Sequence, residues 1–367
     1  MKTQDEIDRG IAFMIDSWES MLEQVGHDVV VAVRRAIWER HGNATEWAVR
    51  VVDDFRAGLI NDVCSYCSVH RPATHDDVVA SIMVAYGRSE GRKLHSWTSD
   101  FAKAYRQVPQ LMSQLPLTVV VQWCPVMSKP VFILSAGQLF GGKTPPQNFS
   151  RHPAWWCYLM APMYGLPLQH TVDDVMATES DDIAHSGNKA WRETIDLAGW
   201  DIPDSKSPTP SRNTCLLGAD VRHDWSGSVL DITEIRADTL VQMISEHMNS
   251  DQLTAGAAAK LYGRLSATSS QTNGKYGRAK LGPIKSRQYG HHHKSLTRQL
   301  RVALLWWFEA LRNRAPRPVP LERARRSNPV ITYSDGEGAS GGVGVVILET
   351  SQMATNQGLY IWKYPTG

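Results

Sequence analysis

Residues Leu166 to Thr178 read LPLQHTVDDVMAT, the most informative stretch of this chain. Two short apolar runs flank the adjacent carboxylates Asp173 and Asp174, and this pattern predicts a tight β-hairpin with both acids at its tip. Two like charges held together beside a buried strand cost free energy unless a cation neutralises them. Divalent metal ions prefer carboxylate oxygens, so the hairpin indicates a metal site, with a solvated surface turn as the alternative.

A further acidic residue lies upstream, at the end of another predicted strand. The stretch LHSWTSDFAKAYRQVP, residues 94–109, alternates as a strand up to Asp100 and then favours a short helix that Pro109 ends. Tyr105 follows on that helix, where it would form the wall of a pocket beside a metal ligand. A lone Asp at this position is usually a helix cap, which is the alternative.

A glycine- and proline-rich stretch, LFGGKTPPQNFSRHPAWWCYLM, separates these two acidic segments. Gly141 allows close approach of another backbone. Thr144 is a predicted N-cap, Pro145 suits the first helical position, and Gln147 completes a capping-box pattern. We therefore expect a helix whose start is placed for contact with a phosphate or a base pair, with a well-capped core helix as the alternative.

The remaining elements follow from the spacing of apolar residues. Helices are predicted over residues 4–40, 183–198, 235–248, 255–266 and 296–312, and strands over 47–55, 117–123, 130–135 and 214–221. Residues 199–207 form a predicted loop that carries Lys206. Residues 314–320 indicate a proline-rich linker, after which strands over 330–333 and 344–348 would form a hairpin.

The charge of the chain is unevenly distributed. The 367 residues carry a formal net charge of +2, yet residues 275–326 contain 14 Lys or Arg against only Glu309 and Glu322. A basic segment in an otherwise acidic chain suits a polyanionic partner such as nucleic acid. A solvated charged surface is the alternative.

The cellular compartment follows from what the sequence lacks. No apolar run reaches the length of a membrane span, and the N-terminal MKTQDEIDRG has no apolar signal-peptide core. We therefore expect an intracellular protein, in cytoplasm or nucleus, with no membrane partner and with its five cysteines reduced. Cys64 and Cys67 form a CxxC with His70 close behind, so a small zinc-binding module is an alternative that metal analysis would test.

The series of motifs, taken in order, resembles the catalytic core of reverse transcriptases, and most closely the retrotransposon enzymes of the DIRS-like kind. SDFAKAYRQVP, with Asp100 and Tyr105, is similar to their first motif, and TVDD is similar to their acidic hairpin, although Thr171 replaces the usual aromatic residue. The remaining matches are to Phe140, Gly141, Pro146 and Phe149 of the second motif, to Lys206 of the lysine loop, and to Leu216–Gly218 after it.

Two flanking segments extend this resemblance. RVVDDFRAGLIN, residues Arg50 to Asn61, is similar to the segment that precedes the palm in these enzymes, but the basic residue usually found just before it is missing. ITYSDGEGASGGVGVVI resembles the first hairpin of an RNase H domain, with Asp335 in the place of its first catalytic acid. Too few residues follow Asp335 to supply the other acids of such a domain.

The resemblance implies an α+β polymerase right hand. Its parts would be an N-terminal helical segment (1–45), fingers and palm (46–225), thumb and connection helices with the basic segment (226–326), and a truncated RNase H-like segment (327–367). The implied activity is that of an RNA-directed DNA polymerase, which adds deoxynucleotides (dNTPs) to a primer on an RNA or DNA template with Mg²⁺ or Mn²⁺. RNase H activity is not expected. The alternative is a catalytically inactive, nucleic-acid-binding remnant of a retroelement, which a primer-extension assay would distinguish.

The resemblance also implies roles for individual residues. Asp100, Asp173 and Asp174 would hold two metal ions, and Lys206 would donate a proton to the leaving pyrophosphate. The incoming nucleotide would meet Arg50, Tyr105, Phe140 and Gly141, with Tyr105 excluding the ribose 2′-hydroxyl. Independently of the resemblance, the charge of the basic segment leads us to expect that Lys275, Arg278 and Lys280 contact the phosphates of the template–primer duplex.

Overall fold

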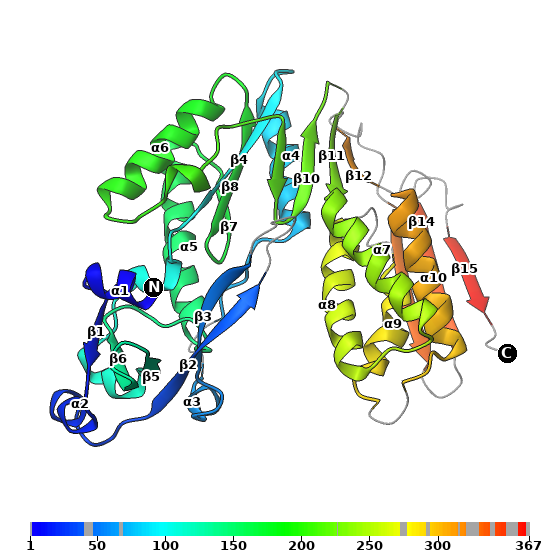
Figure 1. The fold of residues 1–367 in the computed structure, drawn as a ribbon. Helices are drawn as coiled ribbons and strands as arrows, with labels where there is room; N and C mark the ends of the chain where they lie inside the picture. The colour runs from blue at the N-terminus through cyan, green and yellow to red at the C-terminus, as the bar shows by residue number, and fades with distance from the viewer. Residues whose placement is uncertain are drawn as a thin grey trace. The chain divides into compact units, whose positions relative to one another are not determined.

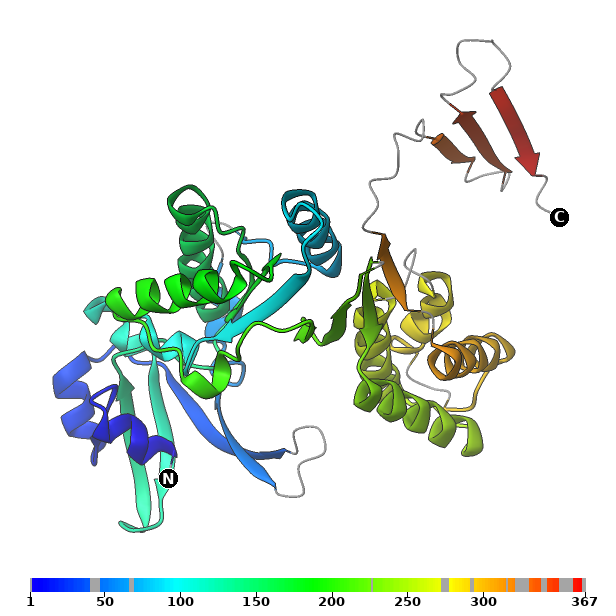
Figure 2. The ribbon, with the colours of Figure 1, turned by 90° about the horizontal axis from the view of Figure 1, so that it is seen from above.

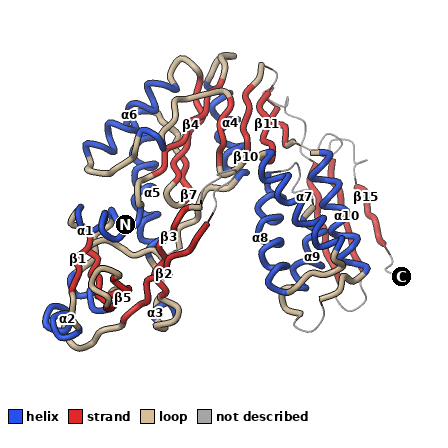
Figure 3. Tube along the Cα trace, in the orientation of Figure 1, coloured by secondary structure: helices blue, strands red, loops and turns tan. Residues whose placement is uncertain are grey.

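The computed structural model describes residues 2–39, 47–65, 69–225, 227–271, 277–290, 294–314, 316–320, 330–337, 342–349 and 359–364. Contacts divide the chain into two compact units, Met1–Val319 and Pro320–Gly367. Helices and strands are mixed throughout the first unit, so the predicted α+β class is confirmed (Figures 1 and 3). Within the described ranges, no helix combines the length and the apolar character needed to cross a bilayer.

The first sheet of the larger unit has five strands in the order β1-β6-β5-β2-β3. Their bounds are β1 (Ala12–Ile15), β6 (Lys129–Ser135), β5 (Val119–Cys124), β2 (Val31–Glu39) and β3 (Ala48–Asp54). Strands β2 and β5 are parallel and the other neighbours are antiparallel. Helices α1 (Lys2–Asp8) and α2 (Trp18–Val25) precede β1 and β2, and α3 (Ile60–Val63) follows β3, while β5 and β6 form a long hairpin in Figure 2.

The helix predicted over residues 4–40 is wrong, because this segment forms two short helices and two strands. Gly10 and Gly26 adopt positive φ angles of 68° and 88° just beyond α1 and α2, and this conformation ends both helices. The β2 sequence VAVRRAIWE is rich in β-branched residues and pairs with β3 on one side and β5 on the other. Pairing with distant strands therefore overrides the local helical spacing.

The second sheet has three strands in the order β4-β8-β7 and contains the predicted acidic hairpin. It consists of β4 (Leu94–Asp100), β7 (Gln169–Thr171) and β8 (Asp174–Ser180). Helices α4 (His75–Arg88), α5 (Pro145–Tyr164) and α6 (Ala184–Leu197) contact these strands (Figure 1). Large side chains from the strands and helices form the core: Trp97, Phe101, Phe149, Met160 and Trp191.

The β4–β8 ladder contains direct side-chain pairs as well as backbone bonds. Ser96 lies opposite Thr178, and their hydroxyl oxygens are 2.7 Å apart. Trp97 donates from Nε1 to Oε2 of Glu179 at 3.2 Å. Strand β8 is buried from Val175 to Ser180 without interruption, so both of its faces are covered. Polar pairs of this kind satisfy groups that would otherwise be buried alone.

Helix α5 begins at Pro145, as predicted, but the predicted capping box is wrong. Thr144 has helical backbone angles (φ −83°, ψ −33°), and its side chain makes no cap hydrogen bond. Oε1 of Gln147 instead accepts a hydrogen bond from the backbone N–H of His70 at 2.9 Å. The helix is therefore held by its prolines and by tertiary contacts rather than by a reciprocal cap.

A third sheet and a bundle of four helices complete the larger unit, with three strands before the helices in sequence and one after them. The strands of this sheet run in the order β12-β11-β10-β9, with β12 (Arg317–Pro320), β11 (Gly227–Ile232), β10 (Ala219–His223) and β9 (Asn213–Leu216). The helices are α7 (Glu234–Asn249), α8 (Ala255–Gln271), α9 (Arg278–Arg287) and α10 (Arg298–Asn313). Leu300, Leu304 and Trp307 of α10 are buried in their common core, as the apolar spacing predicted.

Two predictions for this region are wrong. The single strand predicted over residues 214–221 is a β9–β10 hairpin, because Leu217 and Gly218 turn with positive φ angles of 51° and 70°. The linker predicted over residues 314–320 contains β12. Its prolines are tolerated because β12 is an edge strand, where a missing N–H donor disrupts no ladder on the open side.

The smaller unit contains an antiparallel sheet of β13 (Val330–Glu337), β14 (Gly342–Glu349) and β15 (Leu359–Tyr364) in that order. The predicted hairpin is therefore present, but both strands are longer than predicted and the third strand was missed. Asp335 lies inside β13, with Gly344 as its partner on β14, and not in a turn after the strand.

Candidate active site

The backbone brings the three predicted acids together at one end of the second sheet. Asp100 ends β4 and lies directly opposite Asp174, the first residue of β8. Asp173 occupies the β7–β8 turn after Val172, whose φ angle of 54° is what the tight turn requires. The N–H of Phe101 donates to the carbonyl oxygen of Asp173 at 3.4 Å, so the end of β4 is tied to the tip of the hairpin.

The electrostatics of this group indicate an excess of negative charge. Loss of hydration and the charges of Asp173 and Asp100 raise the pKa of Asp174 to about 6. The pKa of Asp173 is also raised, first by its burial and then by the charge of Asp100. Lys206 opposes both shifts but does not cancel them. A cation bound at this position would therefore stabilise the ionised acids.

Lys206 lies beside the acids, as the sequence predicted, on a short 3₁₀ helix, η3 (Asp204–Lys206). Its Nζ is 2.5 Å from Oδ2 of Asp100. The hydroxyls of Ser207 and Ser99 are 2.8 Å apart, which fixes the lysine loop against β4 next to that acid. The other oxygen of Asp100, Oδ1, is buried and accepts no hydrogen bond from the part of the chain that the structure describes.

The three acids have the chemistry that a hard divalent cation prefers, but their side chains do not converge on a single position. Among the described residues, no three His, Cys, Asp or Glu side chains are arranged to hold a metal ion. The donors are nevertheless carboxylate oxygens, the kind that Mg²⁺ and Mn²⁺ prefer, and one buried oxygen of Asp100 needs a partner. Full use of Asp100 as a ligand would require Lys206 to release Oδ2.

Three residues predicted to bind a nucleotide gather beside the acids. Tyr105, on the 3₁₀ helix η1 (Ala104–Gln107), stacks on Phe140 with ring centroids 5.8 Å apart and an interplanar angle of 18°. The guanidinium carbon of Arg50 lies 5.7 Å from the centre of the Phe140 ring. Burial and the charge of Asp173 raise the pKa of Tyr105, so this phenol is neutral and close to the acids. A half-exposed aromatic surface therefore adjoins the acidic group.

Gly141 follows Phe140, and its contacts explain why no side chain fits there. Its φ angle is 113°, and a Cβ atom would lie 2.1 Å from the carbonyl oxygen of Asp53 on β3. The N–H of Asp53 donates to the carbonyl oxygen of Phe140 at 3.2 Å. The close backbone approach predicted for Gly141 is confirmed, and the backbone that approaches is that of β3.

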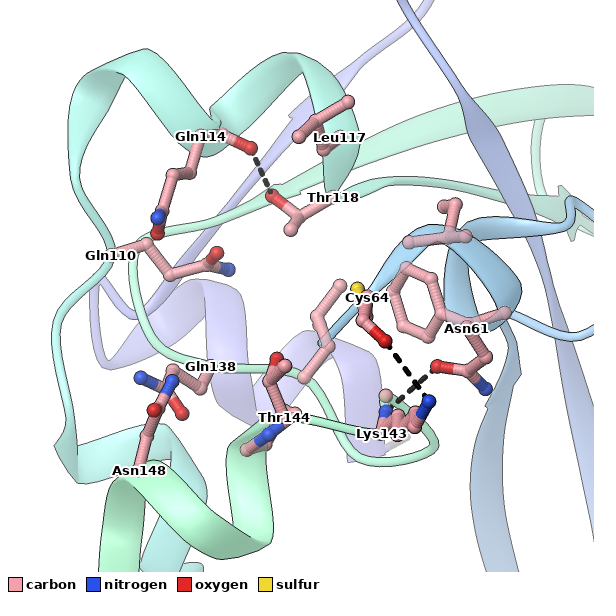
Figure 4. A pocket seen from close by; sticks show the side chains of 15 residues that line it. Asn61, Cys64, Gln110, Gln114, Leu117, Thr118, Gln138, Lys143, Thr144 and Asn148 are labelled. Carbon is pink, nitrogen blue, oxygen red and sulfur yellow. Dashed lines mark hydrogen bonds between the residues drawn. The ribbon is translucent and has the colours of Figure 1, made fainter. Parts of the chain in front are cut away.

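Asn61 on α3 is a positioning residue for which the sequence predicted no role. Its Nδ2 donates to the carbonyl oxygen of Gly141 at 3.1 Å, and its Oδ1 accepts from the N–H of Lys143 at 2.7 Å. Nζ of Lys143 donates to the carbonyl oxygen of Cys64 at 2.9 Å (Figure 4). Asn61 thus clamps both sides of the glycine loop, at the edge of a cavity of about 230 Å³.

The zinc-binding alternative is not tested by these contacts. Cys64 is half-buried with a free thiol, and Cys67 lies outside the described residues. His70 stacks on His170 with ring centroids 4.5 Å apart. The zinc module stays a prediction.

The predicted nucleic-acid-binding residues are only partly described. Arg278 is exposed and Lys280 half-buried on α9, whereas Lys275 lies outside the described residues. Several other cations of the basic segment serve internal contacts: Arg301 pairs with Asp251, Arg314 with Glu234 and Arg317 with Asp76, and the buried Arg287 donates to the carbonyl oxygen of Ser295. The charge available to a polyanion is therefore smaller than the sequence suggests.

No protein-family model and no curated protein matches the chain in sequence. Solved structures of the foamy viral protease-reverse transcriptase match it in fold. The complex with an RNA/DNA hybrid gives a TM-score of 0.61 at 14% identity, covering 100% of this chain and 42% of that chain. The complex with dsDNA gives 0.59 at 13% identity, covering 100% and 65%, and the dRH form with dsDNA gives 0.60 at 14%, covering 99% and 54%. The chain has a reverse-transcriptase-like fold and spans about half the length of these proteins.

Proposed function

We propose that the chain is an RNA-directed DNA polymerase of a retroelement of the DIRS-like kind, which adds dNTPs to a primer on an RNA or DNA template. The observation that carries this proposal is the meeting of Asp100, Asp173 and Asp174 at the end of one sheet, beside the stacked Tyr105 and Phe140. The similarity of fold to a viral reverse transcriptase supports it. Fold alone does not specify chemistry, so the residues of the site carry the argument.

The parts of a polymerase hand would correspond to two of the sheets and to the helical bundle of the larger unit. The five-stranded sheet with α1–α3 would be the fingers, and the β4-β8-β7 sheet with α4–α6 would be the palm. Helices α7–α10, which lie between β11 and β12 in sequence, would be the thumb. The β13–β15 sheet would belong to an RNase H-like segment.

Each residue of the site has a task in the proposed reaction. Asp100, Asp173 and Asp174 would hold two Mg²⁺ or Mn²⁺ ions, which supply Lewis acidity when bound. Tyr105 would present its neutral ring to the sugar and exclude a 2′-hydroxyl. Arg50, whose guanidinium carbon lies 5.7 Å from the centre of the Phe140 ring, would meet the triphosphate. Lys206, once its Nζ leaves Asp100, would be the proton donor nearest to the leaving pyrophosphate.

A primer-extension assay on homopolymer template–primers tests the proposal. Extension of the primer with dNTPs and Mg²⁺ or Mn²⁺ is the expected result. Binding of the template–primer without any extension, in either metal, would instead identify a catalytically inactive remnant. Two observations favour that second candidate. Lys206 pairs with Asp100, and the three acids are not arranged to hold one metal ion.

The basic segment is expected to contact the phosphates of the template–primer duplex. Neutralising Lys275, Arg278 and Lys280 together should weaken binding for all sequences. It should also lower the slope of log affinity against log salt by about 0.9 per lost phosphate contact. Fluorescence anisotropy over a salt series measures both effects.

Lys189 provides the matched control for this charge removal. It is exposed on α6 and paired with Glu193, outside the basic segment. Its replacement by Gln should leave the salt slope unchanged. An unaltered slope in the triple variant would mean that the basic segment is a solvated surface.

We expect no RNase H activity from this chain. Hydrolysis of RNA in a hybrid requires several carboxylates around metal ions. After Asp335 the only acids are Glu337 on the same strand and Glu349 at the end of β14, and no Asp follows. Release of labelled RNA from a hybrid measures the activity. Cleavage that survives purification and disappears in Asp335→Asn would contradict this prediction.

A further inference from the structure

Four charged side chains form a buried ion-pair cluster, Glu6, Arg34, Asp53 and Arg106, between α1, the five-stranded sheet and η1. Arg34 donates to both oxygens of Asp53, at 2.7 and 3.1 Å. Arg106 lies 3.0 Å from Glu6 and 3.5 Å from Asp53, measured from nitrogen to oxygen. The side chains are only 1–13% exposed. Two positive and two negative charges make the cluster neutral.

The ion-pair cluster is attached directly to both aromatic residues of the proposed nucleotide site. Arg106 follows Tyr105 on η1, so the two residues share one turn of 3₁₀ helix. Asp53 holds the carbonyl oxygen of Phe140 through its N–H and touches Gly141 through its own carbonyl oxygen. The Arg106 side chain also donates to Oγ of Ser135 at 2.9 Å, at the end of β6. The cluster therefore links the strand that positions Phe140 to the helix that carries Tyr105.

Stability alone is a weak explanation for such a cluster. Burial of four charges removes their hydration, and the attraction between them offsets that loss only when the geometry is good. Paired guanidinium and carboxylate groups do fix relative orientation, because the planar fork of Arg holds the carboxylates that it binds in one geometry. Here the ion pairs fix the orientation of β3 relative to η1.

We infer that Arg106 is a positioning residue for sugar selection, which through the ion-pair cluster holds Tyr105 and Phe140 at the separation that excludes a ribose 2′-hydroxyl. This inference rests on the proposed polymerase function. The Arg106 side chain is only 8% exposed, and its guanidinium contacts Glu6, Asp53 and Ser135. Its effect on the nucleotide would therefore pass through Tyr105.

The test measures kcat and KM for dNTPs and for ribonucleotides in two variants. Arg106→Lys keeps the charge but loses the planar fork, whereas Glu6→Gln with Arg106→Gln removes one charge of each sign and leaves the Arg34–Asp53 pair intact. In both variants, the ratio of kcat/KM for dNTPs to kcat/KM for ribonucleotides should fall by about tenfold. This is less than the roughly hundredfold loss in rate that a misplacement of about 1 Å can cause. The KM for dNTPs should change more than kcat.

Two controls separate positioning from general loss of stability. Ile133→Val, in the buried core of the same sheet, should lower the melting temperature without changing the ratio. Combined with Tyr105→Val, which removes the aromatic wall, Arg106→Lys should have no further effect on the ratio, because coupled residues are not additive.

The outcomes are distinguishable from those of the polymerase proposal. Absence of primer extension by the unmodified chain would refute the proposed function itself. Extension by the unmodified chain, together with an unchanged ratio in both variants, would overturn only the role of Arg106. An equal fall of the ratio in Ile133→Val would do the same, because the effect would then follow stability.

Discussion

Replacing Asp173 with Asn is expected to abolish primer extension, with a fall in rate of about a thousandfold. Metal-held charge stabilisation is worth several kcal/mol, and about 1.4 kcal/mol corresponds to each tenfold change in rate. The substitution keeps the shape of the hairpin tip but removes one of the charges that raise the pKa of Asp174. Because the lost charge serves the reacting atoms, affinity for the template–primer should change by no more than about twofold.

Asp204→Asn is the matched control for this substitution. Asp204 lies on η3 with Lys206, and its carboxylate pairs with Arg192 on α6. The control variant should retain most of the extension rate. Polymerisation that persists in Asp173→Asn would show that the hairpin acids are an ordinary surface turn.

Shortening Tyr105 to Val should admit ribonucleotides, with a loss of discrimination of about a hundredfold. The ring stacks on Phe140 and also packs edge-on against Phe149, so its position is fixed on two sides. A wall held in this way repels a 2′-hydroxyl sterically, and Val leaves space where the ring stood. The ratio of kcat/KM for dNTPs over ribonucleotides measures the effect.

Tyr105→Phe tests whether the ring or the hydroxyl provides the wall. Burial and the charge of Asp173 raise the pKa of Tyr105, so the phenol is uncharged at neutral pH. Phe should therefore keep discrimination close to that of the unmodified chain. A preference for dNTPs that survives in Tyr105→Val would mean that Tyr105 only fills the core.

The acidic hairpin could be predicted from the sequence because its signals are local. Alternating apolar residues, two adjacent acids and a short return strand lie within 13 residues, and the structure has the hairpin where predicted. The helix predicted over residues 4–40 is wrong for the opposite reason, because the structure of this segment depends on distant strands. The partners of β1 and β2 are β6, β3 and β5, and only β3 lies close to either of them in sequence. Spacing within a segment contains no information about partners so far away.

The ion-pair cluster could not be predicted for a similar reason. Glu6, Arg34, Asp53 and Arg106 are spread over 100 residues, and each alone reads as a surface charge. Helix α4 is a different case, because its signal was present and overlooked. Residues 72–77 read PATHDD, and Thr74 and Asp77 form a reciprocal capping box at the start of α4.

The uninterrupted burial of β8 has a consequence for how the chain reaches its working form. A strand covered on one face resists slippage, because a shift of one residue would turn its apolar side chains toward water, but β8 is covered on both faces and loses that safeguard. The Ser96–Thr178 and Trp97–Glu179 pairs are then what distinguishes the correct alignment from its neighbours. A chain that folded one residue out of step would stay compact, yet Asp100 would no longer face Asp174. Correct pairing at these polar residues, several positions from the acids, thus decides whether a folded molecule also brings Asp100 and Asp174 together.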